Sequence, residues 1–235
     1  MKTDEGAYFK MKVYLKKSLV SELTSNGLLA YVGLRSIYNK EESEAYVSTN
    51  LIHYRLCANG NCTRSWKDNI LSGLDELVGR GLIKVVEEIN KTEVIYDLSG
   101  LYFENEYFIQ IELEDIRRVL SLPCRTDKGA LLKYFVVMVG SFSNIKYESY
   151  TLPKRSFVGF MPISYLAREA RISESSAMTY NSILEDNKII FVYRHPTGYV
   201  DDEGMYHNLN NNYGLYEDKK YIRQFAKSYE AYTDI

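Results

Sequence analysis

With 235 residues, the chain has room for one large domain or two small ones. Hydrophobic residues make up 46% and charged residues 26%, which is the balance of an ordinary protein with enough apolar surface for a core. The formal net charge of −2 and the pI of about 6.0 exclude the strongly basic composition that is a direct signature of nucleic-acid binding.

The cysteine content and the hydropathy of the sequence indicate in which cellular compartment the protein is expected. The longest apolar run, residues 135–139, is too short to cross a bilayer, and residues 1–6 lack the apolar segment of a signal peptide. Three cysteines cannot all pair with one another, and nothing indicates secretion. We therefore expect a cytoplasmic protein with reduced thiols and no membrane partner.

A weak internal repeat organises the chain. An aromatic pair opens an alternating run at residues 8–13 and again at 107–112, and apolar helical segments follow at 28–34 and 131–136. A short strand, two helices and a hairpin come next in both halves. The repeat favours an α+β fold built from two copies of one module, with chance similarity as the alternative. The predicted divisions are residues 1–100 and 101–200 for the modules and 201–235 for a polar loop and a C-terminal helix.

In the first module the predicted order is helix, strand, helix, turn, helix, hairpin. Ser48 stands where a helix N-cap belongs. A second helix is predicted to start at Ser65, whose hydroxyl would cap the backbone N–H of Asp68. The β-branched runs at 82–86 and 93–96 predict a hairpin that turns at Asn90 and Lys91.

The second module repeats this order. A helix is predicted from Ile163, followed by a turn at Arg171 and by a second helix that Ser173 caps. Asn187 and Lys188 then take the place of the glycine that ends the corresponding helix of the first module. Strands are expected on both sides of residues 195–198, which would form the tip of the hairpin.

In both modules, the predicted order of helices and strands is that of a winged helix-turn-helix. The junction formed by Gly81, Leu82 and Ile83 resembles the one that joins recognition helix and wing across winged-helix families, and residues 162–176 resemble bacterial helix-turn-helix sequences. Two such modules in tandem resemble the replication initiators of bacterial plasmids and mobile elements and the DnaD-like primosome proteins. The resemblance implies binding of double-stranded DNA in replication initiation or its control, with transcription regulation as the alternative.

In such a fold the N-terminal side chains of the second helix reach base edges in the major groove, which is about 12 Å wide. The candidates in the first module are Thr63, Arg64, Lys67 and Asn69, and Lys91 in the hairpin would contact a phosphate. Arg64 has the fork geometry that suits guanine.

Basic residues surround the second helix of the second module, whereas its own exposed residues are not basic. The second module therefore suits phosphate positioning or protein binding better than base reading. Its candidate contacts are Lys154, Arg155, Arg168, Arg171, Ser175, Thr179 and Arg194.

The composition also leaves a different class of function open. Winged helices serve as protein-interaction scaffolds, and the near-zero net charge favours this alternative, although DNA contact needs only local positive charge. A homodimer and replication or transcription proteins are further candidate partners.

Catalytic and metal-binding signals are weak. His53, Cys57 and Cys62 are close in sequence, but a closed zinc site needs four ligands, and we favour Cys57 as a buried thiol. No phosphate-binding loop or nucleophile motif is present. We expect a protein that is not an enzyme and has no cofactor or metal. The C-terminal helix is expected to dock on the second module, with oligomerisation as the alternative.

Overall fold

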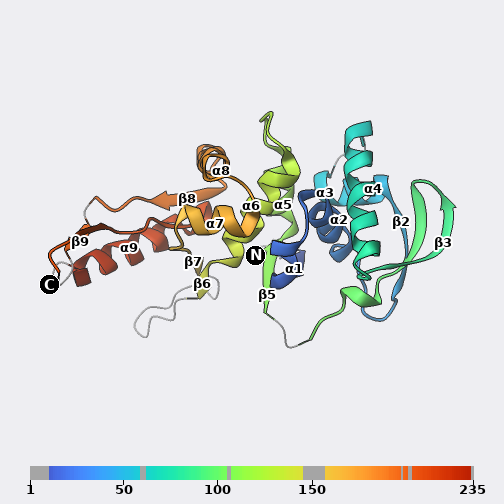
Figure 1. Ribbon diagram of the computed structural model, residues 1–235, viewed down its shortest axis with the longest axis horizontal. Coiled ribbons are helices and arrows are strands. Elements are labelled where there is room, and N and C mark those ends of the chain that lie inside the picture. The colour runs from blue at the N-terminus through green and yellow to red at the C-terminus, as the bar shows by residue number, and fades with distance from the viewer. Residues whose placement is uncertain are drawn as a thin grey trace, which may run out of the picture. The chain divides into compact units, whose positions relative to one another are not determined.

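The computed structural model describes residues 11–58, 62–104, 107–144, 157–196, 198–200 and 203–233 of a mixed α+β fold with small sheets (Figure 1). Internal contacts divide the chain into two compact units, Met1–Ser121 (unit 1) and Leu122–Ile235 (unit 2). The sequence had predicted the division at residue 100.

The described elements of unit 1 are, in chain order, β1 (Lys12–Lys16), α1 (Lys17–Glu22), α2 (Ser25–Arg35), β2 (Glu44–Ser48), α3 (Thr49–Cys57), α4 (Arg64–Gly79), β3 (Lys84–Asn90), β4 (Glu93–Asp97), the 3₁₀ turn η1 (Ser99–Leu101), β5 (Phe108–Glu112) and α5 (Leu113–Ser121).

Strand pairing explains why unit 1 extends past residue 100. β1 pairs antiparallel with β5, so that Val13 lies opposite Ile111 and Leu15 opposite Ile109. All four side chains are buried, which fixes β5 to unit 1. This pairing places β5 in unit 1, although almost a hundred residues separate the two strands in the sequence.

The main sheet of unit 1 is antiparallel with the strand order β2-β4-β3. The predicted hairpin is confirmed, since β3 ends at Asn90 and β4 begins at Glu93. On β4, Val94 and Tyr96 are buried, whereas every residue of β3 is exposed. The sheet therefore packs through its central strand and leaves β3 as a solvated edge.

Local caps define the two helices that follow β2. Ser48 caps α3 as predicted, because its hydroxyl accepts a hydrogen bond from Leu51 N at 3.1 Å. The prediction that Ser65 caps α4 is wrong. The N-cap is Thr63, which has an extended backbone and accepts from Trp66 N at 3.4 Å, so Ser65 lies inside the first turn.

Helix α4 is held by close approach to α2. A Cβ atom on Gly73 would lie only 2.1 Å from the carbonyl oxygen of Asn26, so the two helices touch at this glycine. Ile70, Leu74 and Leu77 are buried on the same side of α4. This packing leaves the opposite side of α4 in solvent.

The described elements of unit 2 are, in chain order, α6 (Lys128–Gly140), β6 (Ser143–Asn144), β7 (Phe157–Val158), α7 (Ile163–Ala170), α8 (Glu174–Asp186), β8 (Ile190–Tyr193), β9 (Gly198–Val200), β10 (Tyr206–Asn208), β11 (Asn212–Leu215), the 3₁₀ turn η2 (Tyr216–Asp218) and α9 (Lys219–Thr233).

The predicted helix pair of unit 2 is confirmed. α7 begins at Ile163, and Ser173 caps α8 by accepting a hydrogen bond from Ser176 N at 3.1 Å. Arg171, between the helices, has a left-handed backbone with φ of 57°. Ala177 and Leu184 are fully buried, so α8 packs through one side only.

The predicted hairpin turn at residues 195–198 is wrong. β8 pairs with β11, whereas β9 pairs with β10. His195 lies between β8 and β9 with a side chain that is only 1% exposed. Its Nδ1 is 2.8 Å from Glu230 Oε1 and its Nε2 is 2.8 Å from Asn212 Oδ1, so His195 joins α9 to β11 instead of forming a tip.

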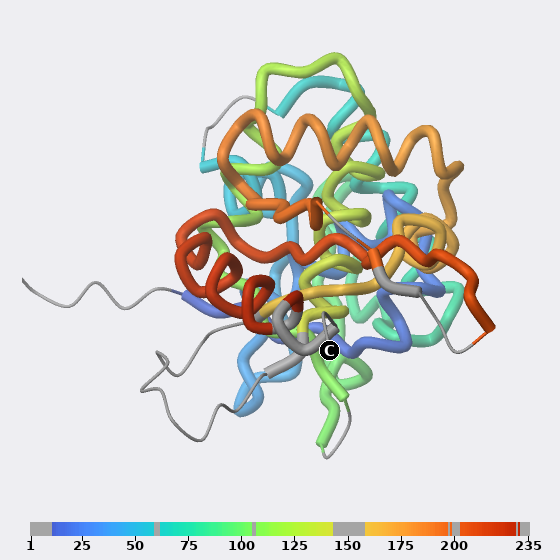
Figure 2. The backbone as a smooth tube through the Cα atoms, turned by 90° about the vertical axis from the view of Figure 1, so that its left-hand side faces the viewer, coloured from blue at the N-terminus to red at the C-terminus, as the bar shows by residue number. Residues whose placement is uncertain are grey.

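The predicted polar loop at residues 208–214 contains a buried strand. Asn212, Tyr213 and Leu215 of β11 are buried against the core of unit 2. As predicted, the C-terminal helix docks on this module: α9 lies beside β8 and β11 (Figure 2). Residues 203–233 are therefore part of unit 2 and not a separate segment.

Both units follow the same order of elements, as the repeat predicted. Unit 1 has α2, β2, α3, α4, β3 and β4, and unit 2 has α6, β7, α7, α8, β8 and β11. In unit 2 the bridge from Gly159 to Tyr213 extends β7 toward β11, so the strand order matches β2-β4-β3. Ala58 after α3 and Arg171 after α7 both have positive φ.

Candidate nucleic-acid interface

The beginning of α4 exposes a basic side chain. Arg64 is the first residue of the helix, and its side chain is 97% exposed. Asp68, one turn later, lies 4.0 Å from Arg64 Nε, at the limit of an ion pair, and such exposed pairs contribute little. The Arg64 guanidinium is therefore available to a ligand.

Contacts of Thr49 bring the start of α4 and the hairpin turn to one end of unit 1. Thr49 N donates a hydrogen bond to Thr92 O at 3.2 Å, and Cys62 Sγ lies 4.0 Å from Thr49 O. Arg64 follows Cys62 closely, and Lys91 directly precedes Thr92. Arg64 and Lys91 therefore belong to the same end of unit 1, although 27 positions separate them in the sequence.

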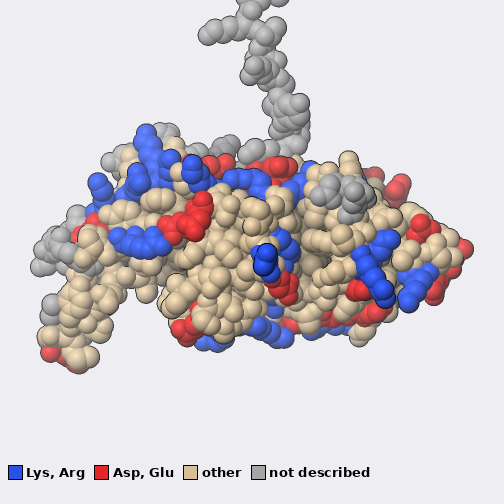
Figure 3. Space-filling model, turned by 90° about the horizontal axis from the view of Figure 1, so that it is seen from above, with Lys and Arg blue, Asp and Glu red and all other residues tan. Residues whose placement is uncertain are grey.

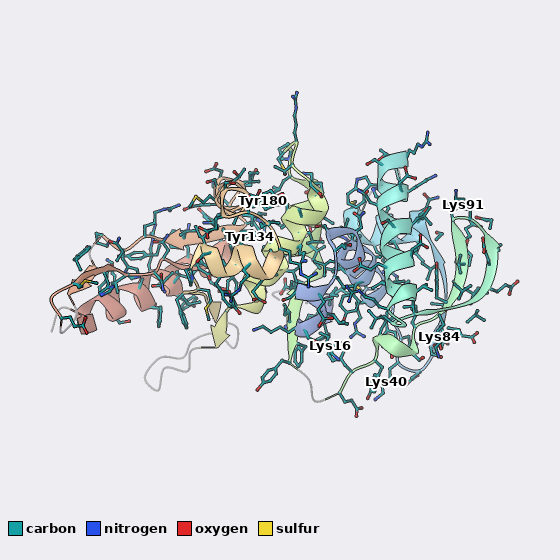
Figure 4. All side chains as sticks on the ribbon, in the orientation of Figure 1. Lys16, Lys40, Lys84, Lys91, Tyr134 and Tyr180 are labelled. Atoms are coloured by element: carbon teal, nitrogen blue, oxygen red, sulfur yellow. The ribbon has the colours of Figure 1, made fainter. Side chains whose placement is uncertain are left out.

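Hydrogen bonds hold the hairpin turn that carries Lys91. Asn90 Oδ1 accepts from Thr92 N at 2.9 Å, and Asn90 Nδ2 donates to Glu93 Oε2 at 2.6 Å. Lys91 is exposed at this turn, whereas Lys84 lies at the opposite end of the hairpin (Figure 4). These hydrogen bonds fix the backbone of the turn, from which the Lys91 ammonium group extends into solvent.

The remaining candidates on α4 differ in exposure. Thr63 is exposed, but its hydroxyl is used as the cap. Lys67 and Asn69 are half-buried, unlike their exposed neighbour Asp68. Burial raises the pKa of the Cys62 thiol, and the nearby charge of Lys67 opposes this shift. Lys67 therefore adds positive charge near the start of the helix.

Ser65 is a further candidate for DNA contact, which the sequence analysis missed because it assigned Ser65 as the helix cap. Because the helix begins earlier than predicted, Ser65 is an exposed residue beside Arg64, and Ser72 is exposed two turns further on. The hydroxyl of Thr63, two positions before Ser65, was the signal that could have identified the true cap. The exposed side of α4 also carries Asp68 and Asp75.

The second helix of unit 2 presents a polar surface without basic side chains. Ser175 and Thr179 are exposed on α8 as predicted. The Thr179 hydroxyl donates to Ser175 O at 3.0 Å, and the Ser175 hydroxyl lies 2.9 Å from that of Ser173. Glu174, Met178, Ser182 and Asp186 are also exposed on α8, so the exposed surface of this helix carries no basic side chain.

Arginines at α7 supply the positive charge of this part of unit 2. Arg168 is exposed, its guanidinium lies 5.2 Å from the centre of the Tyr165 ring, and its Nε is 3.6 Å from Glu169. Arg171 is exposed in the turn before α8. Stacking orients Arg168 while leaving most of it in solvent.

Arg194 does not fit the predicted role of a phosphate contact. Its two terminal nitrogens lie 2.8 and 2.5 Å from the two carboxylate oxygens of Glu185. These hydrogen bonds raise the pKa of Arg194. A phosphate would have to compete with this bidentate pair, so Arg194 is a link between α8 and the end of β8. Lys154 and Arg155 lie outside the described residues.

Charges of both signs are interspersed on the face drawn in Figure 3, where Lys and Arg side chains lie among Asp and Glu side chains. This agrees with the net charge of −2. On this face, positive charge is local and is not gathered into one continuous patch.

The possible zinc ligands occupy structural positions. His53 is buried, and its ring packs edge-on against Trp66 with 5.1 Å between centroids. Cys57 and Cys62 are half-buried and form no disulfide bond. Within the part of the chain that the structure describes, no group of three or more His, Cys, Asp or Glu residues is arranged to hold a metal ion. In the same part, no helix has the length and apolar character needed to span a membrane.

Comparisons with protein-family models, curated proteins and solved structures found no significant match for this chain. The candidate interface is therefore defined by the chain's own residues: the start of α4, the β3–β4 turn, and the arginines at α7.

Proposed function

We propose that this chain binds double-stranded DNA and that unit 1 makes the principal contact. The observation that carries the proposal is the convergence of the exposed Arg64 and the exposed Lys91 at one end of unit 1. A helix start with an arginine suits a base edge in the major groove, and a lysine on a hairpin suits the phosphates beside it.

The topology supports the proposal that each unit is a winged helix-turn-helix. In unit 1 the second and third helices of the motif would be α3 and α4, and the wing would be the β3–β4 hairpin. In unit 2 the corresponding parts would be α7, α8 and the strands from β8 to β11. A recognition helix followed directly by a hairpin brings both within reach of one stretch of duplex.

Unit 2 would act mainly by positioning the duplex. Arg168 and Arg171 are exposed around the α7–α8 turn, whereas the exposed side of α8 carries the acidic Glu174 and no basic side chain. Phosphate contacts of this kind set orientation and register without reading sequence.

The biological role we propose is replication initiation or its control on a bacterial mobile element, without enzymatic activity. This role rests on the resemblance in sequence, and transcription regulation is the alternative. The DNA-binding proposal does not depend on which of the two is correct.

A protein-interaction scaffold is the second candidate function. Two observations favour it: the surface of α8, which carries no basic side chain and leaves Met178 54% exposed, and the interspersed charges of Figure 3. A scaffold of this kind would bind no duplex, so one experiment separates the two candidates.

The test is the fluorescence anisotropy of a labelled random-sequence duplex titrated with the purified full chain at several salt concentrations. DNA binding predicts an association constant that falls with salt, with a log–log slope of about −0.9 for each phosphate contacted. Absence of binding at low salt would remove the DNA proposal and leave the scaffold.

A further inference from the structure

One side of α9 presents four basic side chains to solvent. They are Lys219, Lys220, Arg223 and Lys227, and each of them is exposed. Residues three or four positions apart share a side of a helix, so Lys220, Arg223 and Lys227 form a row, and Lys219 lies four positions before Arg223. At 1.5 Å per residue the row is about 12 Å long. We call these four residues the α9 stripe.

The positive charge of the α9 stripe is not neutralised inside the protein. Among the described residues, none of its four side chains forms an ion pair with a carboxylate. Lys219 Nζ lies 4.7 Å from the centre of the Tyr216 ring, and the Arg223 guanidinium lies 5.0 Å from the centre of the Phe191 ring. These aromatic contacts orient two of the cations and leave their charge available to a ligand.

The acidic residue of α9 is bound by other groups of unit 2. Glu230 is the one Asp or Glu between residues 219 and 233. Its Oε1 is 2.8 Å from His195 Nδ1, and its Oε2 accepts a hydrogen bond from the Tyr193 hydroxyl at 3.3 Å. The carboxylate of this helix is thus held by β8 and the residue that follows it soon after, whereas the cations face solvent.

Helix stability does not explain the α9 stripe. Lys219 and Lys220 begin the helix, at the positive end of its dipole, where cations are disfavoured. Arg223 stands four positions from both Lys219 and Lys227, and like charges at this spacing repel each other. The chain thus places four cations where they weaken the helix by itself. An anionic ligand that neutralises them would account for their presence.

The chemistry of the stripe favours a row of phosphates over a lipid surface. The apolar side chains of Ile222 and Ala226 are 0% exposed, and no aromatic or aliphatic side chain of residues 219–228 is exposed, so the helix has no apolar side to insert into a bilayer. Gln224, which is exposed beside the cations, can also donate to a phosphate. Phosphates recur about every 3.4 Å along each strand of a duplex, so several lie within the length of the row.

We propose that the α9 stripe binds the phosphate backbone of duplex DNA. The stripe is a surface separate from the α7–α8 turn, because α8 and α9 both pack on β8 and Figure 1 shows them on different sides of this strand. The proposal rests on the proposed function and extends it, since unit 2 would hold the duplex through α9 as well as through its arginines at α7. Contacts to phosphates alone carry no sequence information.

The test is the salt dependence of duplex binding by the full chain, measured by fluorescence anisotropy on two duplexes of unrelated sequence. The variant is Lys220→Gln/Lys227→Gln, because these two side chains form no hydrogen bond or ion pair with a described residue. We expect its log–log slope to be smaller than that of the wild type by about two units, and its affinity to fall by the same factor on both duplexes. The control is Lys12→Gln/Lys84→Gln, which removes the same charge from exposed positions of unit 1 and should keep the wild-type slope.

Thermal melting without DNA shows whether the two lysines have a structural role. Lys220→Gln/Lys227→Gln should melt at the temperature of the wild type or slightly higher, because repulsion between like charges is reduced. A clearly lower melting temperature would overturn the proposal, because the lysines would then serve the fold.

The outcomes separate this proposal from the proposed function. If the wild type binds duplex and Lys220→Gln/Lys227→Gln keeps its slope, the α9 stripe is not a DNA contact and the proposed function stands. If the wild type binds no duplex at low salt, both proposals fail. An equal loss of slope in the control would show a general charge effect and overturn the stripe. Sedimentation with phosphatidylcholine–phosphatidylserine vesicles covers the other occupant: vesicle binding that the variant loses, with an unchanged DNA slope, would assign the stripe to lipid.

Discussion

Gly81 and Lys188 occupy the same backbone position in the two units. Each lies just after the second helix of its helix pair, with φ of 68° and 55° respectively. The residue that follows each of them donates a hydrogen bond to a carbonyl oxygen in the last turn of the helix, at 3.0 Å after Gly81 and 2.9 Å after Lys188. The same left-handed turn thus directs both chains from helix to strand, although only one unit has the glycine that favours it.

Lys188→Gly is therefore expected to stabilise the protein by about 1 kcal/mol, because glycine adopts a left-handed backbone without the steric cost of a Cβ. Urea unfolding measures the change. Lys188→Ala is the control, since it removes the side chain but keeps the Cβ, and it should not stabilise. In unit 1, where a Cβ on Gly81 would meet no neighbour, Gly81→Ala should cost about 1 kcal/mol through the backbone alone. Equal stability of the Gly and Ala variants at residue 188 would contradict this account.

Arg64→Ala is expected to weaken duplex binding by about 1–3 kcal/mol and to relax specificity at one base pair. Selection from a random-site library measures both effects. Arg80→Ala is the matched control from the other end of α4, where the guanidinium lies 3.1 Å from Glu76 and 3.6 Å from Glu22. If Arg80→Ala impairs binding as much as Arg64→Ala, the start of α4 is not the contact surface.

Lys91→Ala is expected to weaken binding equally on all sequences and to reduce the salt slope by about one unit. The physical reason is the loss of one phosphate contact from the hairpin turn. Lys84→Ala, at the opposite end of the same hairpin, should leave both affinity and slope unchanged. Salt titrations of the two variants provide the comparison, and identical slopes for both would exclude the hairpin turn from the interface.

Glu76→Gln is expected to lower the free energy of unfolding by about 1 kcal/mol, and Glu76→Ala by about 1–3 kcal/mol. Glu76 on α4 accepts hydrogen bonds from the backbone N–H of Thr24 at 3.1 Å and from its hydroxyl, and so satisfies the start of α2. The adjacent Asp75 is exposed, so Asp75→Asn removes a charge without removing a cap. Urea unfolding should separate the two neutralised variants; a similar loss in both would indicate a general charge effect.

Alkylation should distinguish Cys124 from Cys62. Burial alone would raise the pKa of Cys124, but hydrogen bonds with Thr126 and Lys128, at 3.0 and 3.2 Å, outweigh it and lower the pKa. Burial raises the pKa of Cys62. At neutral pH Cys124 should therefore carry more thiolate and react faster with iodoacetamide. Mass spectrometry of samples quenched over a pH series gives both rates, and Lys128→Met should slow Cys124 only. A faster Cys62 would contradict the assignment.

The sequence by itself determined the elements whose signals are local. Ser48 and Ser173 were identified as caps because a cap bonds to a backbone group only three residues away. The β3–β4 hairpin was predicted because two β-branched runs are adjacent and Asn90 favours the turn between them. The exposed Arg64 and Lys91 follow from these elements, since a helix start and a hairpin turn are solvated positions.

The tertiary structure alone decided where distant segments pair and which charges remain available. The sequence could not choose β11 over β9 as the partner of β8, because several short alternating runs near residue 200 are equally suited to pair, and burial selects among them. It placed His195 in a solvated hairpin tip and predicted a phosphate contact for Arg194, whereas Glu230 and Glu185 bind these two side chains from other elements. A side chain's local sequence indicates its own chemistry, but its partner comes from the packing of residues far along the chain.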